Sequence, residues 1–161
     1  MYRSMRRKKQ EISEEACRVV LSEATSGVLA LCGADNQPYA VPMSYVYDGN
    51  SIYFHSALEG HKIDVIGENP RASFCVVACD RVVPEEFTTY FRSVIVFGNI
   101  RIITDYDDKM KALRKLATKY SPGRVEAMNV EIEKGFDHLH MVELCIEHMS
   151  GKEAIELVRM R

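Results

Sequence analysis

The chain has 161 residues, 47% of them hydrophobic, and its 21 Lys and Arg against 23 Asp and Glu leave a net charge of −2. This size suits one globular domain over residues 1–161, and the charge gives no reason to expect binding to nucleic acid or to acidic membranes. No apolar run approaches the ~20 residues of a membrane helix, no signal-peptide core follows the N-terminal charges, and the five cysteines are scattered through apolar segments. We therefore expect a soluble cytoplasmic protein with reduced thiols.

Residues 1–12 form a predicted basic N-terminal arm. Its cations are Arg3, Arg6, Arg7, Lys8 and Lys9. Such a run is more often a solvated face or a frayed terminus than a binding site. Ser13 then provides an N-cap followed by acidic residues, and the apolar spacing after it predicts a helix over 13–23.

Three strand-like segments follow this helix. The segments 28–32 and 39–47 flank the turn-rich residues 33–38, which predicts a hairpin. A second tight-turn signal, Asp48-Gly49-Asn50, precedes a third strand over 51–55. We expect the three strands to form an antiparallel meander.

The next segments predict one short helix and two longer strands. The helix covers 59–68 and ends before Pro70, because the residue before proline avoids helical geometry. The strands cover 71–79 and 88–104, and Gly98 inside the second one predicts a bulge.

The last third of the chain predicts two helices, over 105–120 and 125–134, and a closing strand over 139–148. This makes about six strands in all, without a regular βαβ alternation. The pattern favours a closed antiparallel barrel with helices at its rim.

The familiar sequence motifs for dinucleotide binding, phosphoryl transfer, ester hydrolysis and zinc peptidases are absent. Cys75 and Cys79 would lie on one strand face about 13 Å apart, with no second pair to complete a zinc site. His138 and His140 would share a face of the closing strand and could chelate a metal or contact heme. Two histidines without a third ligand are more often surface residues, so no metal site is predicted.

The most informative stretch is 54–62, where a predicted strand passes into a predicted helix. Ser56 can donate a hydroxyl, His55 and His61 can donate ring N–H groups, and Lys62 supplies a positive charge. Amides at the helix start add the positive end of the helix dipole. These groups could hold a phosphate. Alternatively, Ser56 caps the helix and the others are solvated, and local spacing favours neither interpretation.

The motifs, taken in order, resemble the pyridoxamine phosphate oxidase-like, FMN-binding split-barrel family, in the branch that includes the nitroimidazole-resistance proteins. The matching segments are 5–8, 27–31, 38–45, 52–57, 60–62 and 69–70, continued by Tyr90, Ser93, Val94, Gly98 and 119–122. The resemblance implies a mainly β fold with helices (α+β), a six-stranded antiparallel split β-barrel. It also implies a homodimer with two FMN molecules in the interface, each touched by both chains. FAD or a deazaflavin in the same groove is an alternative cofactor that the sequence does not exclude.

Carried over position by position, the resemblance assigns three groups of residues to the flavin. Met43, Ser44 and Tyr45 would line the isoalloxazine ring, and Pro42 and Ala57 complete the cofactor-binding set. His55, Ser56, His61 and Lys62 would hold the phosphate, and Arg92 and Ser93 would come from the partner chain. His61 stands where the oxidases carry arginine, so a pH-sensitive donor replaces a bidentate one.

The activity implied is that of a flavin-dependent oxidoreductase, reduced by NADH or NADPH and passing electrons to a small acceptor, for example a nitroaromatic compound. The cofactor would do the chemistry, so no catalytic side chain is predicted. His61 could donate a proton, although phosphate binding is its favoured role. Residues 157–161 lack the arginine- and histidine-rich segment that the true oxidases use on pyridoxal phosphate, which counts against vitamin B6 oxidase activity. The alternative is a non-catalytic flavin- or heme-binding module.

Overall fold

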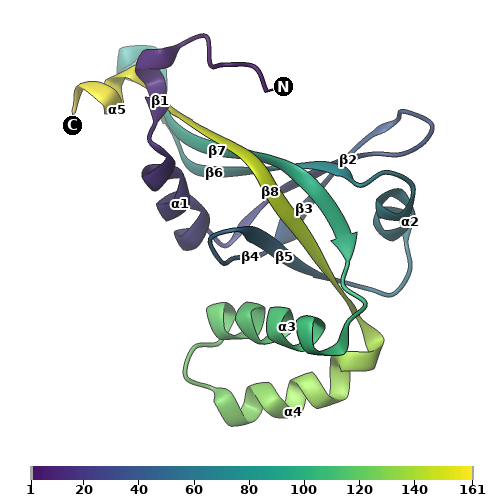
Figure 1. The fold of residues 1–161 in the computed structure, drawn as a ribbon. Helices are drawn as coiled ribbons and strands as arrows, with labels where there is room; N and C mark the ends of the chain where they lie inside the picture. The colour runs from purple at the N-terminus through teal and green to yellow at the C-terminus, as the bar shows by residue number, and fades with distance from the viewer. Residues whose placement is uncertain (1, 161) are drawn as a thin grey trace.

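The computed structural model describes residues 2–160 and contains one antiparallel sheet of eight strands that curls into a barrel (Figure 1). The sheet order is β3-β2-β6-β7-β8-β5-β4, and β1 pairs with β8 outside this path. The strands are β1 Glu11–Ile12, β2 Ser26–Cys32, β3 Pro38–Ser44, β4 Val46–Tyr47, β5 Ser51–Ser56, β6 Arg71–Val83, β7 Thr88–Ile102 and β8 His140–Glu153. The predicted mainly β split barrel is confirmed, and the prediction of six strands missed only the two-residue strands β1 and β4.

The barrel closes at Tyr45, where strand β3 ends and strand β4 begins. Strands β3 and β4 lie at opposite ends of the sheet order, yet Tyr45 alone separates them in the chain. Its side chain is fully buried, and its hydroxyl donates to Leu21 O (2.7 Å). Its ring packs edge to face against Phe74, with ring centroids 4.9 Å apart. The predicted strand 39–47 is therefore two strands. The predicted three-stranded meander is wrong, because β3 pairs with β2 whereas β4 pairs with β5.

The core fills the inside of the barrel with side chains from alternate strand positions. Phe74 is fully buried in this core, and Phe54 packs against it edge to face with ring centroids 5.1 Å apart. A second, smaller core lies at one end of the barrel, between the strands and the two helices formed by residues 106–120 and 125–135. Its buried members are Val46, Ile103, Ala112, Leu113, Leu116, Ile132 and Met141.

The helices are α1 Glu14–Glu23, α2 His61–Glu68, α3 Tyr106–Tyr120, α4 Val125–Gly135 and α5 Ile155–Arg159. Short 3-10 turns are η1 Lys8–Gln10, η2 Pro84–Glu86 and η3 Phe136–His138. The predicted N-cap at Ser13 is confirmed, since Ser13 Oγ accepts from Ala16 N (3.2 Å). Asp105 caps α3 in the same way, because its Oδ1 accepts from Asp108 N (3.0 Å). The four predicted helices are present. Helix α5 was not predicted because five residues are too few to show a helical period.

Part of the predicted basic arm is ordered against the sheet. Glu11 pairs with Lys152 and Ile12 pairs with Gly151, where a Cβ would meet the Ile12 side chain at 2.5 Å. The interpretation of 1–12 as a frayed terminus is therefore wrong for the residues of η1 and β1.

Two bulges bend the long strands. The register of β7 and β8 shifts between Phe97 and Gly98, which confirms the predicted bulge. A second shift between Val77 and Cys79 interrupts the alternation of β6, so Cys75 and Cys79 do not follow a regular strand face. All five cysteines are free thiols. Among the described residues, no helix is long and apolar enough to cross a membrane.

Candidate functional site

The start of α2 packs against β3 and brings together three residues of the predicted site. Lys62 Nζ lies 3.6 Å from Met43 Sδ, and the His61 ring meets Tyr39 edge to face with centroids 4.7 Å apart. Tyr39 and Met43 are four residues apart on β3, so they share one strand face. Met43, His61 and Lys62 therefore form one cluster, which also contains Tyr39, a residue that the sequence prediction did not include.

Lys62 is a half-buried cation that is not ion-paired with any residue in 2–160. Its bonded partner in this part of the chain is the thioether of Met43, which is a weak acceptor. Gly60, the N-cap of α2, has φ 128° and contributes no side-chain cap, while its O accepts from Ile63 N (2.8 Å) and Asp64 N (3.1 Å). Within residues 2–160, the amides of His61 and Lys62 therefore stay open to an acceptor. An unpaired ammonium beside open helix amides fits a phosphate group.

His55 and Ser56, the other two predicted phosphate ligands, are separated by strand alternation. Ser56 is 6% exposed and shares its strand face with the buried Phe54, whereas His55 is exposed. Ala57 follows at the exposed end of β5. The strand thus places the Ser56 hydroxyl and the His55 ring on opposite faces. The alternative role of Ser56 as the helix cap is wrong, because the N-cap is Gly60.

The predicted cofactor-binding residues at 42–45 also differ in the direction of their side chains. Pro42 and Ser44 are exposed on one face of β3, and Met43 lies half-buried on the other. Tyr45 lies in the barrel core, and its backbone N and O are both bonded to the Tyr120 hydroxyl at 3.0 Å. The expectation that the Tyr45 side chain lines a ligand groove is therefore wrong.

One face of the sheet is open and partly apolar. Pro42, Val28, Cys75 and Ile95 lie side by side across β3, β2, β6 and β7. Val28 is 41% exposed and Ile95 39% exposed. This row, which we call the open face, leaves aliphatic side chains in contact with solvent in the single chain.

Arg92 and Ser93 point to opposite sides of β7. Ser93 lies opposite Val77, which is 60% exposed, so Ser93 borders the open face. Arg92 donates to Glu153 Oε2 (2.9 Å), a carboxylate whose side chain is 0% exposed. A hollow of about 560 Å³ lies beside Arg92, between α1, the start of β2 and the bulge of β6.

The end of α3 binds the backbone at two places, just before β2 and between β3 and β4. No role for this end of the helix was predicted from the sequence. The Tyr120 hydroxyl bonds to Thr25 O as well as to Tyr45, and Lys119 Nζ donates to Ala24 O (2.5 Å). The ammonium also lies 4.2 Å from the centroid of the Tyr45 ring, and burial lowers the pKa of Lys119. These contacts span 75 and 95 positions, so no local pattern could have predicted them.

A polar network around Glu143 joins β5, β7 and β8. Ser51 Oγ donates to Glu143 Oε1 (2.9 Å), and Arg101 Nε donates to Oε2 (2.8 Å). Burial raises the pKa of Glu143, but the bonds from Ser51 and Arg101 outweigh it, so the net pKa is lowered. Both oxygens of the Glu143 carboxylate accept hydrogen bonds from within the protein, so we assign Glu143 a role in stabilising the sheet and not in binding a ligand.

His138 and His140 do not share a strand face. His138 lies in the 3-10 turn η3, and His140 is the first residue of β8. Within residues 2–160, no group of three or more His, Cys, Asp and Glu side chains is placed to hold a metal ion.

Comparison with known proteins finds relatives of matching length. The chain is 29% identical over 154 residues to the uncharacterized protein RA0666 of Rhizobium meliloti (strain 1021), covering 89% of this chain and 93% of that protein. A FAD-binding protein of Mesorhizobium loti has a similar structure, with a TM-score of 0.62, 28% identity, and coverage of 90% of this chain and 97% of that one.

Two further solved structures share the fold at lower identity. A FAD and heme binding protein of Mycobacterium smegmatis matches with a TM-score of 0.76 and 23% identity, over 91% of this chain and 73% of that one. A protein of Bacteroides thetaiotaomicron VPI-5482, assigned to 5-nitroimidazole antibiotic resistance, matches with a TM-score of 0.72 and 20% identity, over 89% and 86%. The family model described as pyridoxamine 5'-phosphate oxidase matches residues 13–153. The chain belongs to the pyridoxamine 5'-phosphate oxidase family.

Proposed function

We propose that this chain is a flavoprotein that binds FMN, or FAD, through the start of α2. The observation that carries the proposal is the unpaired Lys62 ammonium beside the open first turn of α2, held against Met43 of β3. Such a donor set fits the flavin phosphate, and His61 lies next to it. The FAD-binding relative from Mesorhizobium loti, similar over 90% of this chain, supports a flavin as the ligand.

The flavin lies in a homodimer interface in this proposal. The open face, with Val28, Ile95 and Val77 exposed, offers an apolar surface that a second copy would cover. Ser93 borders that face and could reach a flavin held by the partner, whereas Arg92 would reach it only through the hollow that it lines together with Val77. Each site would then need two chains.

The activity proposed is electron transfer from NADH or NADPH to a small acceptor, for example a nitroaromatic compound. A bound flavin supplies the hydride and electron transfer chemistry, and the protein binds and orients it. The Bacteroides protein assigned to 5-nitroimidazole resistance supports the acceptor class. Five free thiols suit the reducing cytoplasm, where we place the protein.

The test begins with the purified protein. Flavin absorbance bands, together with the mass of the released cofactor, should identify FMN or FAD. Stopped-flow mixing with NADH or NADPH should then bleach the flavin faster than it bleaches free FMN. Reduction no faster than free FMN would reduce the proposal to a non-catalytic flavin-binding module.

A heme-binding module is the second candidate, supported by the FAD and heme binding protein of Mycobacterium smegmatis. The ligand would be His138 or His140 at the start of β8. A Soret band in the purified protein, lost in His138→Ala or in His140→Ala, would establish heme in place of a flavin.

A further inference from the structure

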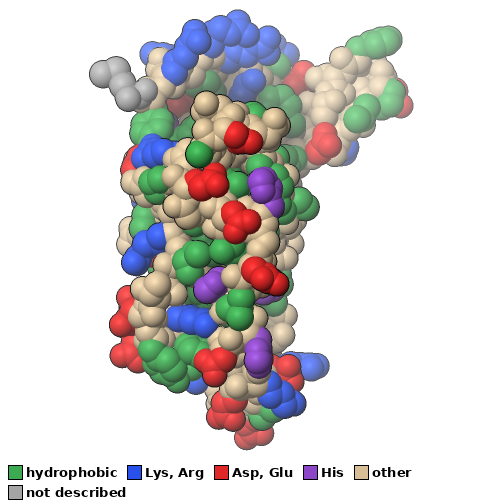
Figure 2. Space-filling model, turned by 90° about the vertical axis from the view of Figure 1, so that its right-hand side faces the viewer, with side chains coloured by type: hydrophobic (Ala, Val, Ile, Leu, Met, Phe, Trp, Pro, Cys, Tyr) green, Lys and Arg blue, Asp and Glu red, His purple; other side chains and the backbone are tan. Residues whose placement is uncertain are grey.

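The four consecutive cations Arg6, Arg7, Lys8 and Lys9, which we call the basic turn, have no ion-pair partner in the described part of the chain. The side-chain bond that does occur joins Arg7 Nη1 to the amide oxygen of Gln10 at 3.5 Å. Figure 2 shows Lys and Arg side chains gathered at the end of the molecule that carries the N-terminal segment. The whole chain has a net charge of −2, so this patch is a local feature.

The basic turn is held at its C-terminal end. Gln10 is 5% exposed, and its backbone N–H donates to Arg7 O (2.9 Å). Strand β1 follows at once and pairs with β8 through Ile12, which is 4% exposed. The cations therefore project from a fixed backbone.

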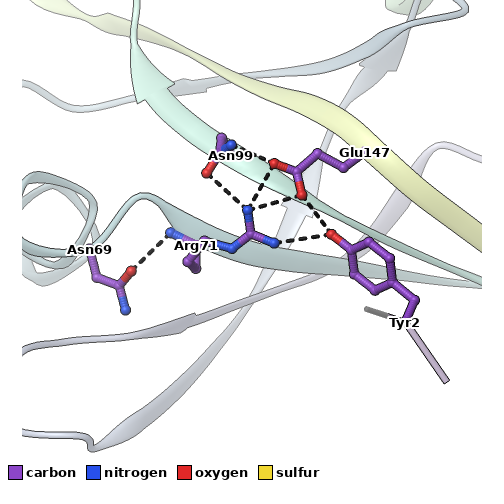
Figure 3. A network of polar contacts seen from close by, with 5 residues as sticks. All are labelled: Tyr2, Asn69, Arg71, Asn99 and Glu147. Carbon is purple, nitrogen blue, oxygen red and sulfur yellow. Dashed lines mark hydrogen bonds and ion pairs between the residues drawn. The ribbon is translucent and has the colours of Figure 1, made fainter.

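The segment is also held upstream, at Tyr2 (Figure 3). The Tyr2 hydroxyl donates to Glu147 Oε2 (2.6 Å) and accepts from Arg71 Nη2 (3.0 Å). Its ring stacks on His148 with centroids 4.5 Å apart and planes inclined by 11°. Because both ends of the segment are fixed, the basic turn loses less conformational entropy when it binds an anion.

A hollow of about 550 Å³ lies against the basic turn. Its lining residues are Arg6, Arg7, Lys8, Lys9, Gln10 and Ile155, so every charged group around it is positive. This volume is typical of sites for small ligands. Guanidinium forks and ammonium groups together recognise a phosphate monoester, which carries up to two negative charges.

The basic turn lies close to the open face. Glu11 pairs with Lys152, which pairs in turn with Ser93, so Glu11 and Ser93 are two strand spacings apart, about 10 Å. Lys152 itself is a cation on this path, with Nζ 5.3 Å from the Phe91 ring centroid. A ligand that reached a flavin beside Ser93 could therefore extend its far end to the basic turn.

We infer that the basic turn binds the 2′-phosphate of NADPH and makes NADPH, rather than NADH, the hydride donor. The inference rests on the proposed function, because the nicotinamide must meet a flavin next to Ser93. The 2′-phosphate is the group by which the two donors differ. The rest of the chain is more acidic than the whole, which favours a small phosphorylated ligand over a nucleic acid.

The experiment uses the flavin-loaded protein and its Arg6→Gln/Lys8→Gln variant, with Lys134→Gln on α4 as an exposed-cation control. Stopped-flow reduction should give a Kd for NADPH at least about tenfold below that for NADH in the wild type and the control. The double variant should bring the two values together by raising the Kd for NADPH, with the Kd for NADH and the flavin content unchanged.

Calorimetric titration with 2′,5′-ADP provides a second readout that needs no flavin reduction. The wild type should bind it, the double variant should lose binding, and Tyr2→Ala, which releases the anchor but keeps the charges, should weaken it. Equal reduction by NADPH and NADH, without 2′,5′-ADP binding, would overturn the inference and leave the oxidoreductase proposal standing. A flavin that neither donor reduces would overturn both. Tighter binding of a short single-stranded DNA than of 2′,5′-ADP would also overturn the inference.

Discussion

The cations of this protein fall into two groups that differ in their surroundings. Arg92, Arg101 and Lys115 each meet a carboxylate on a different element, at 2.9 Å or less. Lys62 and the basic turn meet none among residues 2–160. The carboxylates that meet the first group are at most 20% exposed, and burying such a charge is costly unless it is paired, so the first group stabilises the fold. The second group keeps its charge available for a ligand. Removing a paired cation should therefore cost stability, and removing an unpaired one should cost binding.

The largest effect is expected at Arg92. Arg92→Met removes a partner of the fully buried Glu153 carboxylate and should lower the free energy of unfolding by about 3 kcal/mol. Urea denaturation measures this. Arg71→Met, which removes an exposed pair with Glu147, is the matched control and should change the midpoint far less. Equal effects in the two variants would break the distinction between buried and exposed pairs.

The next effect concerns Lys62 and appears in flavin binding. Lys62→Met should weaken the binding of FMN by roughly 1.5–3 kcal/mol, because it removes one charge-assisted bond to phosphate. Fluorescence titration measures the affinity, and the urea midpoint should stay as in the wild type. Lys115→Met provides the contrast, since it breaks the pair with Asp48 and should lower stability while leaving FMN affinity unchanged. Unaltered FMN affinity in Lys62→Met would remove Lys62 from the site.

A pH-dependent effect is expected at Glu143. Its pKa is lower in the folded protein than in the unfolded chain, so its contribution to stability is complete above the unfolded value, about 4.3. That contribution is lost as the pH falls through the lower folded value. Glu143→Gln should therefore destabilise the protein by roughly 1–2 kcal/mol at pH 7, and less at pH 3.5. Urea denaturation at both pH values checks this, and the same difference at both would contradict it.

The smallest effect is expected at the exposed pair on α4. Lys134 and Glu131 are 3.7 Å apart with side chains that are 70% and 78% exposed. Lys134→Gln should change the free energy of unfolding by less than about 0.5 kcal/mol, because solvent screens such pairs. A thermal melt measures the change. A loss comparable to that of Arg92→Met would show that pairing alone, without burial, determines stability here.

Local signals predicted the elements of this fold well. Ser13 and Asp105 act as the helix caps that their residue types favour, and Gly98 marks a bulge. Contacts between distant segments were not predictable in this way. The break at Tyr45 depends on Leu21 and Tyr120, and the pairing of Ile12 with Gly151 joins the two ends of the described chain.

The candidate site was predicted in part. Lys62 and Met43, which the resemblance assigned to the phosphate and to the ring of one flavin, contact each other although 19 positions separate them. The division of His55 from Ser56 follows from strand alternation, which the buried Phe54 could have revealed in advance. The same period separates Arg92 from Ser93. Whether Lys62 has an ion-pair partner among residues 2–160 depends on the whole fold, so only the structure could show that it has none there.

Strand β8 also determines when the barrel can assemble. This one strand pairs with β1, β5 and β7, so three parts of the sheet depend on residues 140–153. Contacts of such long sequence separation form slowly, and the apolar faces of the earlier strands stay uncovered until then. On the ribosome, the barrel cannot close until residue 153 has emerged. Chaperone protection should therefore matter most while the preceding strands wait for β8.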